Sequence, residues 1–252
     1  MQMSNSQKKH KSPSKSTIAG SCKDYKIVPN WAPGYLMDKW TRKYMLLAKT
    51  LAEDNDACYA RKIGVVLVSE NNRIISMGYN GSVEKAPHND SREYLQFLYS
   101  DLLDEKEREF LATQGARCQE EFVDRYAGCR QCPRRILGIP SGEKLYLCSC
   151  AHAERNCLAS ANQSGVSTFN STMYCYCGVP CHECTLQIIQ AKVTRVVCLK
   201  GEGDYSKSSR GLFQMTAVRL EEVERGEIEA ASSFLAGRDQ SSVSSEASPI
   251  LG

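Results

Sequence analysis

The sequence lacks the features of a membrane protein, a secreted protein or a strongly charged protein. Its longest apolar run, from Ile63 to Val68, is about a third of the length that a membrane helix needs. Residues 1–27 contain no apolar stretch typical of a secretory signal, so we expect neither a membrane span nor export. The net charge is only +3, which gives no overall basic field that would favour nucleic acid as a partner.

The charge that is present lies mainly in the first residues. Six lysines and one aspartate stand within residues 1–27, among several serines and without periodicity. We expect residues 1–34 to form a disordered basic arm, and the alternative is a nuclear-import or nucleic-acid-binding patch around residues 8–11. Residues 236–252 contain five serines and no periodicity, which predicts a disordered C-terminal tail. One nearly neutral domain, residues 35–235, remains. We expect a cytoplasmic protein, with the nucleus as the alternative.

Cysteine is abundant, with thirteen residues of which most lie between positions 118 and 198. An odd number without a secretory signal argues against a disulfide framework. The pattern favours thiolates that bind metal in a reducing compartment.

Hydrophobic periodicity predicts alternating strands and helices. Apolar residues recur at three- and four-residue steps from Tyr35 to Glu53, which indicates an amphipathic helix. Two short strands joined by a tight turn follow, at 63–68 and 73–78. Beyond them we expect helices at 151–161, 181–191 and 209–217, and strands at 171–176, 194–199 and 218–223. This alternation predicts an α/β layer structure with right-handed crossovers.

Residues 84–147 interrupt this pattern. Glu93 to Leu111 has the composition of a charged, solvated helix, and Pro133, Gly138 and Pro140 then impose irregular backbone. We interpret about 84–147 as an insertion that needs a stabilising element of its own.

A spacing of histidine, glutamate and cysteines carries the clearest chemical signal. His152 and Glu154 open one expected helix, and Cys181 and Cys184 open another after Pro180. Residues three apart lie on one side of a helix, and the helix N-terminus favours thiolates. One imidazole and two thiolates make three zinc ligands and leave a fourth position for water, while Glu154 stays free to move protons. The alternative is a closed structural zinc site in which Glu154 or another cysteine is the fourth ligand.

The pattern H-x-E followed by P-C-x-x-C is the signature of the zinc nucleobase deaminases. The chain resembles the cytidine and deoxycytidylate deaminase superfamily, and within it the deoxycytidylate (dCMP) deaminases, over roughly residues 35–84 and 148–223. The segments that carry the resemblance are Trp40–Ala48, Cys58–Val68, Gly78–Gly81, His152–Asn156 and Asp204–Phe213.

The resemblance implies a three-layer α/β/α cytidine deaminase-like fold with a mixed sheet of about five strands and a cysteine-containing insertion. It implies that His152, Cys181 and Cys184 hold zinc, that a water activated by the metal attacks C4 of the pyrimidine, and that Glu154 moves the protons. The reaction would be hydrolysis of dCMP to dUMP and ammonia, which supplies dUMP for thymidylate synthesis. Substrate contacts would come from three further residues, Asn80, Ala153 and Tyr205.

The resemblance also suggests a homo-oligomer, often a hexamer, and regulation by dCTP and dTTP. Alternative activities are deamination of another cytosine nucleotide or nucleoside, such as dCTP or cytidine. A deaminase of tRNA or single-stranded DNA is disfavoured because the neutral domain offers no basic groove for phosphates. A catalytically inactive zinc-binding regulator is the alternative outside enzymes, and the intact Glu154 argues against it. For a nucleotide phosphate, the sequence offers Lys85, Arg61 and Arg210 as candidates without choosing among them.

A second cysteine pattern frames the end of the insertion. Cys129 and Cys132 form one pair, and Cys148 and Cys150 form another after 15 intervening residues. Paired cysteines at this spacing predict a structural zinc bound by four thiolates. The alternatives are unligated thiols, or Cys118 in place of one ligand. Because Cys150 precedes His152 by two residues, this site would support the catalytic one.

Overall fold

The core of the protein is a mixed five-stranded sheet. The computed structural model describes residues 37–140, 142–201 and 206–242. The strand order is β2-β1-β5-β6-β7, with bounds Ile74–Tyr79, Gly64–Val68, Thr172–Cys175, Arg195–Leu199 and Arg219–Val223. Strand β1 is antiparallel to β2 and β5, whereas β5, β6 and β7 are parallel to one another. This confirms the expected mixed sheet.

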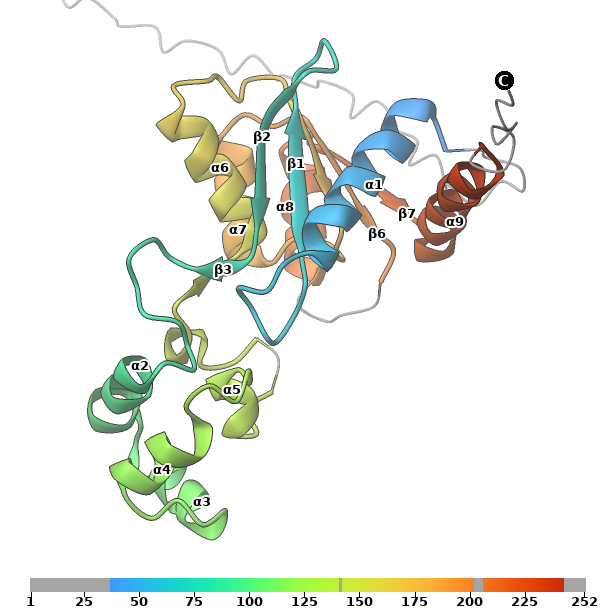
Figure 1. Ribbon diagram of the computed structural model, residues 1–252. Coiled ribbons are helices and arrows are strands. Elements are labelled where there is room, and N and C mark those ends of the chain that lie inside the picture. Colours follow the sequence, from blue (N-terminus) through green and yellow to red (C-terminus); the bar gives the residue numbers. More distant parts are fainter. Residues whose placement is uncertain (1–36, 141, 202–205, 243–252) are drawn as a thin grey trace, which may run out of the picture. The chain divides into compact units, whose positions relative to one another are not determined.

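Helices cover both faces of the sheet (Figure 1). Helices α1 (Lys39–Glu53) and α9 (Arg225–Ser242) pack on one face, and α6 (Ala153–Gln163), α7 (His182–Gln190) and α8 (Ser206–Met215) pack on the other. Successive residues of β1 explain this arrangement, because side chains alternate between the faces of a strand. Val65 and Leu67 enter the core beneath α6 and α7, while Val66 and Val68 enter the core beneath α1. The three-layer α/β/α architecture follows.

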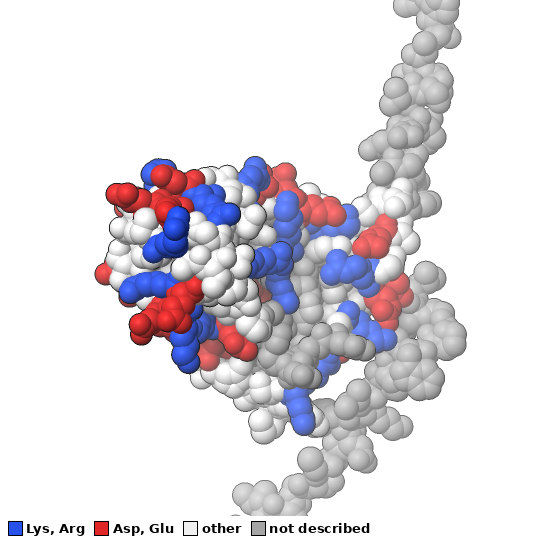
Figure 2. Space-filling model, turned by 90° about the horizontal axis from the view of Figure 1, so that it is seen from below, with Lys and Arg blue, Asp and Glu red and all other residues white. Residues whose placement is uncertain are grey.

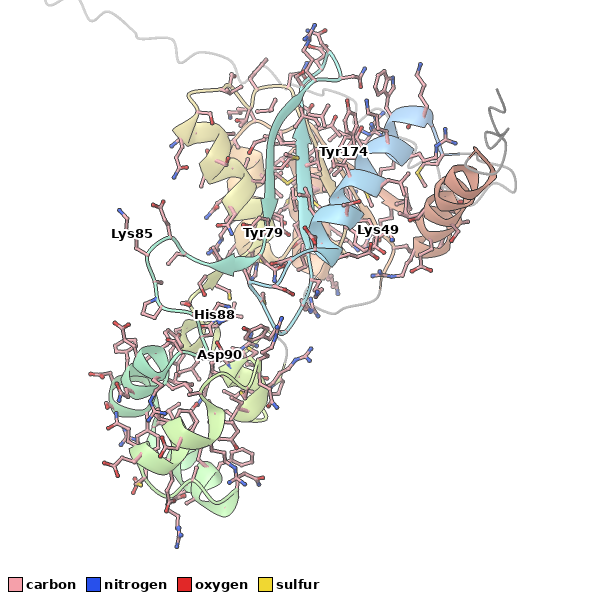
Figure 3. All side chains as sticks on the ribbon, in the orientation of Figure 1. Lys49, Tyr79, Lys85, His88, Asp90 and Tyr174 are labelled. Atoms are coloured by element: carbon pink, nitrogen blue, oxygen red, sulfur yellow. The ribbon has the colours of Figure 1, made fainter. Side chains whose placement is uncertain are left out.

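The sequence of helix α1 determines where the helix starts and which face is buried. The Asp38 carboxylate accepts hydrogen bonds from the backbone N–H groups of Trp40 and Thr41 and so caps the first turn. Tyr44 on the buried side packs against Tyr174 of β5, with ring centroids 5.1 Å apart (Figure 3). This aromatic contact joins α1 to the sheet, within a cluster that is otherwise mainly aliphatic.

The insertion is mainly helical. It contains α2 (Arg92–Phe97), the π-helix η1 (Leu98–Leu102), α3 (Glu105–Thr113), α4 (Gln119–Tyr126), α5 (Pro133–Ile136) and the 3-10 helix η2 (Leu145–Leu147), and it is flanked by β3 (Gly81–Ser82) and β4 (Cys150–Ala151). The single helix expected over 93–111 is divided at Leu103, whose backbone is extended. Asp104 and Glu107 then form a reciprocal capping box that starts α3.

The insertion has a hydrophobic core of its own, which the sequence analysis did not anticipate. Side chains from its helices pack together away from solvent, among them Leu95, Leu98, Leu111, Phe122 and Leu147. Strands β3 and β4 pair antiparallel, with Gly81 opposite Ala151. The two ends of the insertion are thereby joined immediately before His152.

Two further expectations concern the N-terminal arm and the C-terminal tail. Helix α9 continues to Ser242, into the range 236–252 expected to be a tail, and no proline interrupts the chain before Pro249. Residues 243–252 and the arm expected over 1–34 lie outside the described residues. Among the helices of the described part, none has both the length and the apolar character needed to cross a membrane.

Candidate active site

Two helix N-termini bring the predicted metal ligands together. His152 is the N-cap of α6 and Cys181 is the N-cap of α7. The Nδ1 atom of His152 lies 3.3 Å from Sγ of Cys181 and 3.4 Å from Sγ of Cys184. Donor atoms of the three residues all lie within 4.8 Å of one another. The structure therefore brings together His152, Cys181 and Cys184, as their spacing in the sequence predicted.

The donor set of this cluster fits zinc. An imidazole nitrogen and two thiol sulfurs are the ligands that zinc prefers, and three protein ligands leave one position open. Contact with the Cys184 thiol, and then with His152, lowers the pKa of the Cys181 thiol to about 4. The pKa of the Cys184 thiol is raised in turn by that same contact. A cation at this point would have a thiolate to bind.

Glu154 lies beside the cluster in the first turn of α6. Its side chain is only 3% exposed, and its Oε2 atom has no hydrogen-bond partner within the described part of the chain. Burial raises the pKa of the carboxyl group above its ordinary value. A buried carboxyl with one oxygen unpartnered is suited to hold a proton and to pass it to a bound molecule.

Strand β2 fixes the start of α6 from one side. Gly78 in this strand lies against the backbone of α6, where a side chain would collide with Ala153 and Cys157. The Asn156 side chain donates a hydrogen bond of 2.8 Å to the carbonyl of Tyr79. These contacts hold the turn that carries His152 and Glu154.

Asn80 is buried and holds the chain before β1. Its Oδ1 atom accepts hydrogen bonds from the backbone N–H of Ile63 and from Nδ2 of Asn55, both at 2.9 Å. Its Nδ2 atom donates to the carbonyl of Arg61 at 2.7 Å. Asn80 thus lines the pocket and also supports its wall.

Ala153 and Tyr205 are the other two residues predicted to contact the substrate. Ala153 is fully buried between His152 and Glu154, at the first position of α6. Tyr205 lies outside the described residues.

A pocket of about 450 Å³ opens in front of the cluster. His152, Glu154 and Cys181 line one part of it, and residues of the insertion line another. This volume lies within the range of small-molecule sites. The sequence analysis did not predict that the insertion would form a wall of this pocket.

The three basic candidates for a phosphate contact lie in different places. Arg61 lines the pocket. Lys85 is exposed in the loop after β3 (Figure 3), and Arg210 forms an ion pair with Glu222. Acidic and basic side chains are interspersed over much of the face in Figure 2.

A second cluster of thiols lies beside the same pocket. Side-chain contacts run from Cys132 to Cys148, from Cys148 to Cys150, and from Cys150 to Cys58. Cys132, Cys148 and Cys150 belong to the predicted set of four, and Cys58 is a further member that the sequence did not predict. Cys129 instead packs at the edge of the insertion's hydrophobic core. Cys58 follows α1 and is far from the others in the sequence, so spacing alone could not identify it.

Polar side chains at the start of the insertion lie near this thiol cluster, and Asn89 contacts it directly. Nδ2 of Asn89 donates hydrogen bonds to Sγ of Cys150 at 2.9 Å and to Sγ of Cys148 at 3.5 Å. His88 lies beside Asp90, with Nδ1 2.7 Å from the carboxylate, while Nε2 lies 3.1 Å from the carbonyl oxygen of Ala57 (Figure 3). Such outer contacts orient ligands in metal sites.

Comparison with known proteins agrees with this geometry. Residues 38–200 match the model of the cytidine and deoxycytidylate deaminase zinc-binding region. A deoxycytidylate deaminase of Saccharomyces cerevisiae is 28% identical over 171 residues, which are 68% of this chain and 38% of that protein. The chain thus spans less than half the length of this curated relative.

Two solved structures are more distantly similar. The dCMP deaminase of cyanophage S-TIM5 in complex with dCMP and dUMP is 18% identical, with a TM-score of 0.46, over 75% of this chain and all of that one. A diaminohydroxyphosphoribosylaminopyrimidine deaminase/reductase of Thermotoga maritima is 15% identical, with a TM-score of 0.43, over 81% of this chain and 42% of that one. From the family match over residues 38–200, the chain belongs to the cytidine and deoxycytidylate deaminase family.

Proposed function

We propose that the protein is a zinc-dependent deaminase that hydrolyses dCMP to dUMP and ammonia. The observation that carries this proposal is the buried Glu154, whose Oε2 has no partner in the described residues, beside the cluster of His152, Cys181 and Cys184. The choice of dCMP is supported by the similarity to the yeast deoxycytidylate deaminase. The dUMP formed would serve thymidylate synthesis.

His152, Cys181 and Cys184 would hold the zinc ion, which when bound lowers the pKa of water and so supplies a nucleophile at neutral pH. Glu154 receives the proton that this water loses and delivers it to N3 of the cytosine ring. It then takes the second proton from the new hydroxyl group on C4 and gives it to the amino group, whose bond to C4 breaks, so that water and cytosine yield uracil and ammonia. Burial suits the carboxyl to this cycle because it favours the protonated form.

Asn80, Ala153 and Tyr205 are proposed to contact the substrate. The position of Asn80 in the pocket lining supports this role. Its amide also makes hydrogen bonds to the backbone of Arg61 and Ile63. Ala153 lies between the ligand His152 and the proton carrier Glu154.

The thiol cluster is proposed to hold a second zinc with a structural role. Its ligands would be Cys58, Cys132, Cys148 and Cys150, because these are the thiols that contact one another. The hydrogen bonds from Asn89 to two of the sulfurs are of the kind that stabilises metal-bound thiolates.

The assembly and its regulation are proposals from the family. We propose a homo-oligomer, with a hexamer as the expected form, and dCTP and dTTP as effectors in the cytoplasm. Exposed apolar side chains on the edge strand β2, namely Ile74, Met77 and Tyr79, support contact with a second copy. Light scattering of the purified protein, with and without each nucleotide, tests both proposals.

A substrate panel tests the reaction itself. Ammonia release is measured with dCMP, deoxycytidine, cytidine and dCTP, and zinc is measured in the same preparation. We expect kcat/KM for dCMP to exceed that for deoxycytidine by at least about 10³, since a charged phosphate contact contributes strongly to binding. Preference for dCTP would change the substrate and keep the chemistry. A zinc-loaded protein without activity on all four would favour a regulator.

A further inference from the structure

The insertion places two arginines in the wall of the active-site pocket. Arg134 and Arg135 lie in the short helix α5, and both line the pocket that also contains His152 and Glu154. The Nη2 atom of Arg135 donates a hydrogen bond of 2.7 Å to the carbonyl of Ala60. Because Ala60 precedes Arg61, this bond brings the insertion against the segment that carries the third arginine of the pocket.

Arg134 retains hydrogen-bonding capacity that the described protein does not use. Its Nη2 atom donates to the carbonyl of Pro140 at 2.8 Å. Its Nε atom is buried and has no hydrogen-bond partner among the described residues. A buried donor without an acceptor is costly, so an acceptor on a bound molecule would be favoured here.

Besides the thiols of the cluster, the charged groups at this wall of the pocket are arginines. The carboxylates of the pocket belong to other elements: Glu154 lies in α6, and Glu183 lies in α7, where it faces Arg155 at 3.9 Å. The arginines come from α5 and from the segment before β1. A guanidinium presents parallel N–H donors that match the oxygens of a phosphate group.

We propose that Arg134 and Arg135 form the subsite for the 5′-phosphate of the substrate and so make the enzyme selective for a nucleotide over a nucleoside. This inference rests on the proposed deamination of a cytosine nucleotide. Helix α5 begins directly after Cys132, so the thiol cluster fixes the position of both arginines. The insertion thereby acts as the part of the enzyme that recognises the phosphate.

Arg134 also has a structural alternative that the test must separate. Contacts with the Cys132 and Cys150 thiols lower the pKa of the Cys148 thiol, and the charge of Arg134 contributes to the same shift. If Arg134 only balances the charge of the thiol cluster, its loss would reduce metal content and stability and would affect all substrates equally.

The experiment compares a nucleotide with its nucleoside in single variants. Arg134→Gln and Arg135→Gln are assayed with dCMP and with deoxycytidine, and zinc is measured in each preparation. Arg117→Gln is the matched control, because Arg117 is exposed in the insertion and pairs with Glu121. We expect kcat/KM for dCMP to fall by about 10- to 100-fold in each pocket variant, as for a lost charged hydrogen bond. Activity on deoxycytidine and zinc content should stay unchanged, and the control should match the wild type.

Other outcomes overturn the proposal. Parallel losses on both substrates would make the arginines structural, and unchanged activity on dCMP would place the phosphate elsewhere. A wild type inactive on every cytosine substrate would overturn the proposed function instead. In that case calorimetric titration with dUMP and deoxyuridine decides the subsite separately. Weaker binding of dUMP alone in the variants would support it, and equal binding of dUMP by variants and wild type would refute it.

Discussion

Gly78 of β2 lies so close to Cys157 of α6 that a Cβ atom on the glycine would come 2.5 Å from the backbone nitrogen of the cysteine. The carbonyl oxygen of Ala153 would lie at the same distance. Ser76, two residues earlier, donates a hydrogen bond of 2.8 Å to the carbonyl of Cys157. The strand and the helix that carries Glu154 are therefore joined through backbone contact, which leaves no room for a side chain at position 78.

The first prediction concerns this close approach. Gly78→Ala should lower the free energy of unfolding by about 1–3 kcal/mol, because backbone atoms cannot yield as a flexible side chain would. Activity should fall further than stability suggests, since a displaced α6 moves both His152 and Glu154. Gly211→Ala is the control, because a Cβ there meets open space in helix α8. Urea unfolding and ammonia release measure the two effects; equal stability of both variants would contradict the packing.

The second prediction separates two roles of Asn80. Its amide makes buried hydrogen bonds to Asn55, Ile63 and Arg61, so Asn80→Ala should lower the free energy of unfolding on the order of 3 kcal/mol. Asn156→Ala, which loses one hydrogen bond to Tyr79, should cost about 1 kcal/mol. Urea unfolding compares the variants. If Asn80→Ala keeps its stability and loses only activity, the residue acts on the substrate alone.

The sequence predicted the sheet, its helices and the cluster of His152, Cys181 and Cys184 because these depend on local patterns. The short, continuous apolar run from Ile63 to Val68 identified β1, and residues at helix starts identified His152, Cys181 and Cys184. Helix N-termini of neighbouring α/β units meet at one edge of a sheet, so a short motif in each was enough. The regular order of strands and helices brings the two motifs together, so no contact within an irregular region had to be predicted.

The insertion could not be predicted to the same degree. Its leucines define a separate core, but their pattern is divided among short helices and was interpreted as one solvated helix. Cys58 belongs to the thiol cluster and Arg134 to the lining of the pocket, and both groups bring together residues that are far apart in the sequence. Sequence spacing favoured Cys129 over Cys58, since Cys129 pairs with Cys132 along the chain, whereas the tertiary contacts select Cys58.

The third prediction tests which cysteines hold the second metal. Cys58→Ser should remove one of two zinc ions per chain, whereas Cys129→Ser should leave both in place. The first variant should also lose thermal stability, because a structural zinc contributes on the order of 10 kcal/mol of folding free energy in small domains. Elemental analysis and thermal unfolding are the measurements. The reverse result would restore the set predicted by spacing, and one zinc in the wild type would exclude the second site.

The fourth prediction concerns Glu154 as proton carrier. Glu154→Gln keeps the size of the side chain but cannot exchange a proton, so turnover should fall by roughly 10² to 10⁴ while zinc content is retained. Glu183→Gln, at the exposed side of the same pocket, is the control and should retain most activity. Loss of zinc in Glu154→Gln would make the residue a ligand, and near-normal turnover would refute its catalytic role.

The same pair of variants carries a prediction about pH. Burial raises the pKa of Glu154 above its ordinary value of 4.5, so the folded protein binds a proton that the unfolded chain has released. Stability from this group is complete below pH 4.5 and is lost as the pH rises toward the raised pKa, by up to about 1.4 kcal/mol per pH unit. Glutamine does not titrate, so Glu154→Gln should gain stability relative to the wild type as the pH rises from 5 to 8. The stability of Glu183→Gln should stay within ~0.5 kcal/mol of that of the wild type over the same range. Urea unfolding across this range measures the difference. A wild type that gains stability over Glu154→Gln as the pH rises would mean that Glu154 is held in its ionised form.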